Sequence, residues 1–296
     1  MRHLLGIAEL TETELSAVLD RTAKIAQGAI FSFAQPVALA FYEPSTRTEM
    51  SFVRACQMVG ASVLRLLPER ASVVKGEGPE ETLHTLRAIG ARVLVVRSGE
   101  PLLPHRLSEL GVAVVNAGDG CHEHPTQALA DLVALQRAVG AVRGLRVLVV
   151  GDHLHSRVSR STVRLLSQQG AKVELAGPPD LLPEGFAEML GADHCPDLEQ
   201  GLSRADVVMA LRIQQERMGQ TVVADLGAYR RQWGITQERY LGLRQVPWLM
   251  HPGPANLGVE IDSELVDGTK SLIRSQVTSG TQVRAAVLSL LGEEVA

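Results

Sequence analysis

The feature that most constrains this chain is a series of short apolar runs separated by segments with helical periodicity. Each run has the composition of a buried strand. The eight runs are Pro36–Tyr42, Val63–Leu67, Val93–Val96, Val112–Asn116, Val147–Val150, Val173–Ala176, Val207–Leu211 and Trp248–Met250. Strands that alternate with helices form parallel sheets, because a helix supplies the crossover between parallel neighbours. The pattern predicts an α/β fold of doubly wound parallel sheets; a single closed barrel is the alternative, and the uneven helix spacing disfavours it.

The chain is long enough for two domains with separate cores, at 296 residues. A break at Gly140–Gly144 directly precedes a fresh strand, so we expect a second domain over 141–274. The last helix, over about Val277–Leu291, is expected to return to the first domain. The first domain is therefore predicted to comprise 1–140 plus 275–296, with the active site in the cleft between two doubly wound domains.

Composition and charge exclude several classes of function. The net charge of −4 gives no general attraction to nucleic acid or to anionic membranes. No run approaches the roughly 20 apolar residues of a membrane-spanning helix, and the first residues lack the long apolar core of a secretory signal. Three widely spaced cysteines indicate reduced thiols. These features predict a cytoplasmic protein with no nucleic-acid or membrane partner.

The segment Ser45-Thr46-Arg47-Thr48 follows a predicted strand and opens a helix. The free amides and the dipole of a helix start favour an anion, and the three hydroxyls and the guanidinium fork add donors that suit phosphate. The alternative is that Ser and Thr simply cap the helix and Arg47 is a solvated charge. The Gly-Lys pair of the P-loop is absent.

Other polar residues stand where strands end or helices begin. Pro125 suits the first turn of a helix, which places His124 and Gln127 at its start; a capping histidine is the alternative. Arg97 ends one apolar run, and ligands of α/β sheets gather beyond such ends. Arg157 and Arg212 follow two strands of the second domain, as a pair able to bind the two carboxylates of a dicarboxylic amino acid.

Seven stretches in order resemble the aspartate and ornithine carbamoyltransferase family, and they extend along nearly the whole chain. The most specific is Pro44-Ser45-Thr46-Arg47-Thr48, which is similar to the carbamoyl phosphate signature of that family. The others are Ser72–Glu77, Val95–Arg97, His124–Gln127, His155–Val158, Leu211–Gln214 and His251–Pro254.

The resemblance implies that carbamoyl phosphate donates its carbamoyl group to the amino group of L-aspartate, in de novo pyrimidine biosynthesis. It implies that catalysis rests on Arg47, Thr48, Lys75 and His124. It assigns carbamoyl phosphate binding to Ser45, Thr46, Arg47, Thr48, Arg97, His124, Gln127, Gly253 and Pro254. It assigns aspartate binding to Lys75, Arg157, Arg212 and Gln214. No metal and no organic cofactor is expected for this reaction.

The resemblance also implies an assembly. Ser72 and Lys75 of the family's mobile loop would reach the active site of a neighbouring subunit, which implies a homotrimer with shared sites. Association with regulatory chains or with another enzyme of the pyrimidine pathway is left open.

Three other functions compete with this one. An ornithine-specific member would carry a Cys in the loop equivalent to His251–Pro254 and a Ser-Met-Gly motif, and this chain has neither. A metal-dependent hydrolase could use the pairs His122-x-His124 and His153-x-His155. A Rossmann-like binding module is disfavoured, because no G-x-G-x-x-G follows the strand at Val147–Val150.

Overall fold

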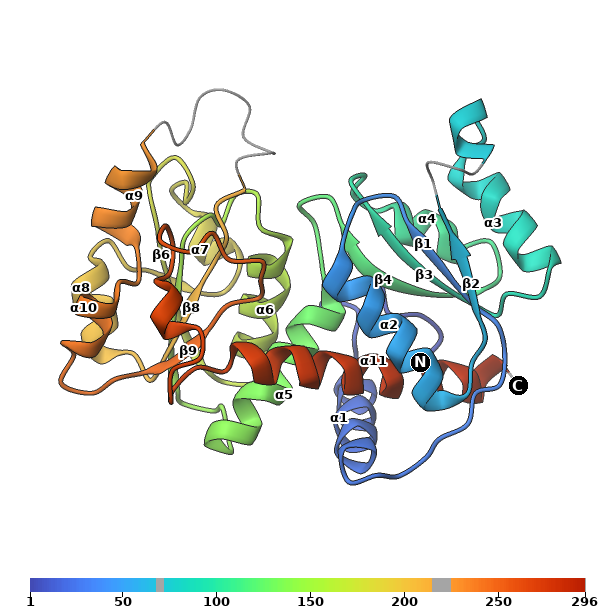
Figure 1. The fold of residues 1–296 in the computed structure, drawn as a ribbon, viewed down its shortest axis with the longest axis horizontal. Helices are drawn as coiled ribbons and strands as arrows, with labels where there is room; N and C mark the ends of the chain where they lie inside the picture. The colour runs from blue at the N-terminus through green and yellow to red at the C-terminus, as the bar shows by residue number, and fades with distance from the viewer. Residues whose placement is uncertain (68–71, 215–224, 296) are drawn as a thin grey trace. The chain divides into compact units, whose positions relative to one another are not determined.

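The computed structural model describes residues 1–67, 72–214 and 225–295 (Figure 1). The chain divides into two compact units: unit 1 is Met1–Ala130 with Val277–Ala296, and unit 2 is Asp131–Gln276. The division falls within helices α5 (Pro125–Val139) and α11 (Ile273–Val295). The sequence placed the first break later, after residue 140. The assignment of one substrate to each domain stays a prediction.

Unit 1 is built on a four-stranded parallel sheet in the order β2-β1-β3-β4, with helices packed along it (Figure 1). The strands are β1 (Val37–Phe41), β2 (Val63–Leu66), β3 (Val93–Ser98) and β4 (Ala113–Asp119). Its helical elements are α1 (Glu12–Ala26), α2 (Thr46–Val59), η2 (Ser72–Lys75), α3 (Pro79–Ala88) and α4 (Leu103–Ser108), with parts of α5 and α11.

The N-terminal segment covers the β4 edge of this sheet. Leu4 donates its N–H to the Val114 carbonyl at 2.8 Å and accepts from the Asn116 N–H at 2.8 Å. Because an unpaired edge strand exposes a row of backbone donors and acceptors, this contact protects β4 from pairing with another chain. It also brings the residues that follow Leu4 close to β4.

Helix α11 fastens two helices of unit 1. Arg284 is buried and donates to the Ser51 hydroxyl of α2 at 2.7 Å, with its guanidinium over the Phe52 ring. Arg21 of α1 donates to the Ser289 hydroxyl at 2.9 Å. The end of the chain therefore supports α2, the helix that follows the predicted phosphate loop.

Unit 2 is built on a five-stranded parallel sheet in the order β7-β6-β5-β8-β9. The strands are β5 (Arg146–Val150), β6 (Lys172–Ala176), β7 (Asp193–His194), β8 (Val207–Ala210) and β9 (Trp248–Met250). The helical elements are α6 (Arg157–Gln168), α7 (Phe186–Met189), α8 (Leu198–Arg204), α9 (Leu226–Trp233), α10 (Gln237–Leu241) and η4 (Ser263–Leu265).

The predicted class of fold is confirmed, and each predicted apolar run contains a strand. The barrel alternative is wrong, because the strands form two open sheets. Strand β7 was missed: it has two exposed residues and so carries no apolar run. The three cysteines are free, as expected. Among the described helices, none combines the length and hydrophobicity that spanning a membrane requires.

A chain of buried hydrogen bonds ties α5, α6, α11 and the end of β9 together within unit 2. Asp131, fully buried, accepts from the Thr162 hydroxyl at 2.8 Å and from Gln276 Nε2 at 2.8 Å. The side-chain oxygen of Gln276 in turn accepts the His251 N–H at 3.0 Å. Since each partner is satisfied by the next, this network fixes the position at which the chain leaves β9.

His153 is a core residue of unit 2 and has no exposed surface. Its Nε2 lies 3.1 Å from the Ala176 carbonyl and its Nδ1 2.8 Å from the Ser159 hydroxyl. A carbonyl can only accept, so Nε2 carries the proton and Nδ1 accepts from Ser159. Burial lowers the pKa of His153 to about 4.

His153 should make unit 2 less stable in mild acid. The unfolded chain binds a proton at His153 below about pH 6.5 and the folded chain only below about pH 4, so stability present at neutral pH is lost as the pH falls between these values. Between about pH 8 and about pH 5, wild type should lose about 2 kcal/mol more free energy of unfolding than His153→Gln. Urea denaturation of both proteins at both pH values measures the difference, and equal losses would refute it.

Candidate active site

The predicted phosphate loop lies between β1 and α2, as the sequence suggested. Ser45 is the N-cap residue of α2, with φ −161° and ψ 86°. Every residue of α2 is described, and the Ser45 side chain forms no capping hydrogen bond with any of them. The Ser45 hydroxyl is therefore not used as a cap, contrary to the alternative interpretation. Thr46 and Arg47 are exposed and Thr48 is buried, so the loop presents amides, hydroxyls and a guanidinium at a helix start.

Arg97 lies at the end of the strand next to this loop. Phe41 of β1 pairs in register with Arg97 of β3, and the Tyr42 N–H donates to the Arg97 carbonyl at 2.8 Å. The guanidinium donates to the Ala117 carbonyl of β4 at 3.2 Å, and its Nε lies 3.9 Å from a Glu43 carboxylate oxygen. Arg97 thus stands at the same edge of the sheet as the loop after β1.

The loop after β4 is organised by the buried carboxylate of Asp119. Its Oδ1 accepts from Asn116 Nδ2 at 2.8 Å and from the Glu123 N–H at 3.0 Å, and its Oδ2 accepts from the Leu102 N–H at 2.7 Å and lies 3.0 Å from His122 Nδ1. Burial acts to raise the pKa of Asp119, but these hydrogen bonds outweigh it and hold the pKa below its ordinary value. The loop therefore turns around a carboxylate anion.

This turn ends at His124, directly before α5. The His124 carbonyl accepts from the Gln127 N–H at 3.0 Å and from the Ala128 N–H at 3.2 Å, which makes it the first acceptor of the helix. His124 is 4% exposed, and Gln127 lies one turn further on with partial exposure. Because β1, β3 and β4 are adjacent and parallel, the residues that follow them gather along one edge of the sheet of unit 1.

Lys75 occupies a different position from the other predicted residues of unit 1. It ends the short helix η2 and is exposed. No described contact joins it to Arg47, Arg97 or His124. The side chain of Ser72, which was expected to act with Lys75, lies outside the described residues.

In unit 2, Arg157 and Arg212 follow two adjacent strands. Arg157 is buried and is the first residue of α6, where the Ser156 hydroxyl accepts the Ser159 N–H at 3.1 Å. Arg212 follows β8 by two residues, and the Leu211 N–H donates to the Val150 carbonyl of β5 at 2.7 Å. Both arginines therefore lie beyond the carboxyl ends of paired strands.

Asp152 links the loops that carry these two arginines. This fully buried carboxylate accepts from the His155 N–H at 3.1 Å, lies 3.0 Å from His155 Nδ1, and is 3.4 Å from the Gln214 N–H. Gln214 Nε2 donates to the His155 carbonyl at 2.9 Å. The structure thus brings Arg157, Arg212 and Gln214 to one edge of the sheet of unit 2.

The loop after β9 reaches the same edge and carries Gly253 and Pro254, which are joined by a cis peptide bond. The Gly253 N–H donates to His251 Nδ1 at 2.8 Å, so the proton of a neutral His251 is on Nε2, 3.4 Å from Glu260 Oε1. Glu260 also accepts the Asn256 N–H at 2.5 Å. Buried Glu260 therefore holds this loop through the Asn256 N–H, and its carboxylate lies beside the His251 ring.

Sequence reasoning missed the carboxylates that position these loops. Asp119 and Asp152 share a pattern that could have revealed them, Gly-Asp-x-x-His directly at the end of a strand. Glu260 stands nine positions after His251 in a segment with no periodicity, and its role follows from the fold alone.

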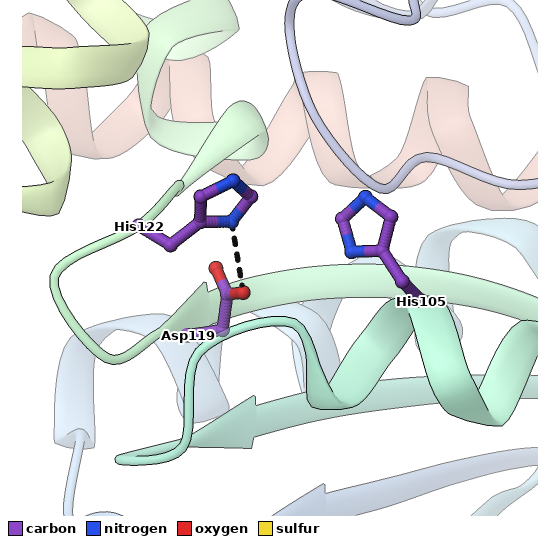
Figure 2. Close-up of side chains that lie close together, drawn as sticks. All are labelled: His105, Asp119 and His122. Carbon is purple, nitrogen blue, oxygen red and sulfur yellow. Dashed lines mark hydrogen bonds and ion pairs between the residues drawn. The ribbon is translucent and has the colours of Figure 1, made fainter.

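The two histidine pairs of the hydrolase alternative are not grouped as metal ligands among the described residues. His153 uses both ring nitrogens in the core. His122 lies not with His124 but with Asp119 and His105, and these three are the one group of potential metal ligands found among the described residues (Figure 2).

Family models match both halves of the chain. Residues 2–137 match the carbamoyl-P binding domain of aspartate/ornithine carbamoyltransferases, and residues 143–291 match the Asp/Orn binding domain of the same family. The aspartate carbamoyltransferase catalytic subunit of Salinispora arenicola is 44% identical, over 98% of each chain. That of Natranaerobius thermophilus is 40% identical over 97% of this chain and 94% of its own length.

Solved structures show the same relationship. The catalytic subunit of M. jannaschii aspartate transcarbamoylase is 30% identical, with a TM-score of 0.85 over 99% of each chain. Aspartate transcarbamoylase from Trypanosoma cruzi, in complex with N-(phosphonacetyl)-L-aspartic acid, is 25% identical, with a TM-score of 0.87 over 97% of this chain and 95% of its own.

Replacing Glu260 should destabilise unit 2. In Glu260→Ala, the part-buried Asn256 N–H loses its acceptor, and an unsatisfied donor of this kind costs about 1–3 kcal/mol. We expect a loss of about 1–3 kcal/mol in the free energy of unfolding, measured by urea denaturation. Glu264→Ala, which removes an exposed carboxylate close by, is the control and should change stability by less than about 0.5 kcal/mol. Similar losses in both variants would contradict the assigned role.

Proposed function

Because this chain belongs to the aspartate/ornithine carbamoyltransferase family, we propose that it transfers the carbamoyl group of carbamoyl phosphate to the amino group of L-aspartate. The products are N-carbamoyl-L-aspartate and phosphate, in de novo pyrimidine biosynthesis. Relatives that are 40% and 44% identical over nearly the whole chain are aspartate carbamoyltransferase catalytic subunits.

One observation of the structure supports this function most strongly. In each unit, the predicted ligand residues other than Lys75 follow adjacent parallel strands and lie along one sheet edge. The edge in unit 1 carries phosphate-type donors, and the edge in unit 2 carries two arginines with a glutamine. This distribution fits a phosphorylated donor on unit 1 and a dicarboxylic acceptor on unit 2.

In the proposed unit 1 site, the phosphate is bound by the loop after β1. The α2 amides, the hydroxyls of Ser45, Thr46 and Thr48, and the Arg47 guanidinium offset its charge. Arg97 contributes from the neighbouring strand, where Ala117 and Glu43 hold its guanidinium. Stabilising the phosphate makes it a better leaving group, so these contacts act on the reaction as well as on binding.

The carbamoyl group is proposed to lie against the start of α5. There His124 and Gln127 donate hydrogen bonds to its carbonyl oxygen, where negative charge develops during attack. Gly253 and Pro254 contribute from the loop that Glu260 fixes in unit 2. Placed in advance, such donors stabilise the transition state without reorganising at the moment of reaction.

Arg157, Arg212 and Gln214 are proposed to bind L-aspartate. Two guanidinium groups suit its two carboxylates, whereas the side-chain ammonium of ornithine would need an acidic partner. Lys75 is proposed to complete the aspartate site from a neighbouring subunit. This distribution of charge favours aspartate over ornithine as the acceptor.

The reaction is a substitution at the carbamoyl carbon. The neutral amine of aspartate forms the new C–N bond and gives a tetrahedral intermediate, and the bond from carbon to the phosphate oxygen then breaks. The proton lost by the amine passes to the departing phosphate, since none of the proposed residues is placed as a general base. Holding both substrates in line supplies much of the rate enhancement. We infer a cytoplasmic homotrimer as the working form.

The function is tested by carbamoyl transfer with carbamoyl phosphate and either L-aspartate or L-ornithine as acceptor. We expect ureido product with aspartate alone. Arg47→Gln should lower kcat/KM by about 10²–10³-fold, because it removes the charged donor from the phosphate. Arg54→Gln, an exposed arginine of the same helix that bonds Gln57, is the matched control and should retain wild-type kinetics. Product with ornithine alone would overturn the assignment of Arg157 and Arg212.

A shared active site is tested by co-expressing two inactive variants, Lys75→Ala and His124→Ala, with different affinity tags. In a mixed cyclic trimer, one site in three pairs an intact His124 with an intact Lys75 of its neighbour. The purified hybrid should therefore recover about a third of the wild-type activity. Chains that carry only Lys75→Ala are the control and should stay inactive. A hybrid with no activity would show that each subunit supplies its own Lys75.

A further inference from the structure

A group of metal-ligating side chains lies in unit 1 apart from the proposed substrate residues. His105 of α4, Asp119 at the end of β4 and His122 in the loop after it each offer a ligand atom, and these atoms lie within 4.8 Å of one another (Figure 2). Neither the sequence pattern nor the proposed reaction uses this combination. The three residues come together because α4 precedes β4 and the turn after β4 folds back.

Asp119 and His122 already have the separation of two ligands of one ion. Asp119 Oδ2 and His122 Nδ1 are 3.0 Å apart. Ligand atoms at about 2.0–2.1 Å from a tetrahedral zinc ion stand roughly 3.3 Å from each other. The carboxylate is fully buried and is fixed by Asn116, Glu123 and Leu102, so it cannot turn away from this position.

His105 is oriented as a third ligand. Its Nε2 lies 2.9 Å from a Glu9 carboxylate oxygen, which holds the proton on that nitrogen. Its Nδ1 is buried and has no hydrogen-bond partner among the described residues, and Figure 2 shows a ring nitrogen of His105 turned toward Asp119 and His122. A histidine whose other nitrogen donates to a carboxylate is the usual arrangement around a protein-bound metal.

We propose that His105, Asp119 and His122 form a binding site for a divalent transition metal ion of the zinc type, with Glu9 positioning His105. Two imidazoles and one carboxylate suit Zn²⁺, whereas Mg²⁺ and Ca²⁺ require oxygen ligands throughout. The ion replaces the proton shared by His122 and Asp119, and that proton passes to solvent. The imidazole side chains are partly exposed, at 25% for His105 and 36% for His122, so an ion can enter and a water can complete the coordination.

The site would join three segments of unit 1. Glu9 belongs to the N-terminal segment that pairs with β4, His105 to α4, and His122 to the turn that ends at His124. A bound ion would therefore stabilise the turn before the proposed carbamoyl site. It takes no part in the transfer reaction, which is proposed to proceed without a metal.

The proposal is tested by zinc binding to the full chain, purified without a polyhistidine tag and stripped with EDTA. Titration with ZnCl₂ should give one ion per chain and raise Tm. His105→Gln should lower the affinity for zinc by at least about tenfold. Glu9→Gln should lower it by about tenfold, because losing a carboxylate that positions a histidine ligand typically reduces metal affinity by that factor or more. His155→Gln is the matched control: it removes the histidine of the other Asp-His pair, which has no third ligand in the described chain, and should bind zinc as wild type does.

Spectroscopy separates a built site from adventitious binding. Co²⁺ should give wild type the intense visible absorption of a four-coordinate ion, and His105→Gln should lose it. MgCl₂ alone should neither bind nor raise Tm. The proposal is overturned if wild type takes up no zinc, or if His105→Gln binds zinc as tightly as wild type does. If His105→Gln does not fold, unchanged zinc affinity in Glu9→Gln overturns it instead.

Discussion

The parallel arrangement of the strands is the constraint on which the rest of this structure depends. Neighbouring parallel strands cannot be joined by a hairpin, so each connection crosses the sheet, and every carboxyl end meets its neighbour's at one edge. Residues that are 27 to 77 positions apart, such as Arg47, Arg97 and His124, reach that edge because β1, β3 and β4 are neighbours in the sheet. The order of the strands in the sheet therefore brings these residues together, independently of contacts between their side chains.

Carboxylates without access to solvent then set the conformation of the loops at these edges. Asp119 and Asp152 each accept several hydrogen bonds, including backbone N–H groups, and each lies beside a histidine three residues on. Burying an ionised carboxylate is costly unless such donors compensate it. Because the compensation requires one loop conformation, each aspartate selects that conformation and with it the positions of the nearby residues proposed as ligands.

The sequence was sufficient for the strands and for the loop residues that follow them, because apolar runs and helix starts are local patterns. The helix start at Pro125 is formed as that residue indicates. Contacts between distant segments could not be predicted from the sequence. The fold brings together three such pairs: Asp131 with Gln276, Glu260 with His251, and His105 with Asp119. Strand β7 could not be predicted either, because it lacks the apolar side chains that indicate a strand.

Unit 1 is discontinuous in sequence, and this affects the order in which the two units can fold during synthesis. Unit 2 is one continuous stretch, whereas unit 1 needs its final helical segment, which supports α1 and α2 through Arg21, Ser289 and Arg284. A ribosome makes the chain from residue 1 onward at about 5–20 residues per second. All of unit 2 has therefore been translated before the last helix of unit 1 exists, and the first half of the chain to be made is the last to complete its core.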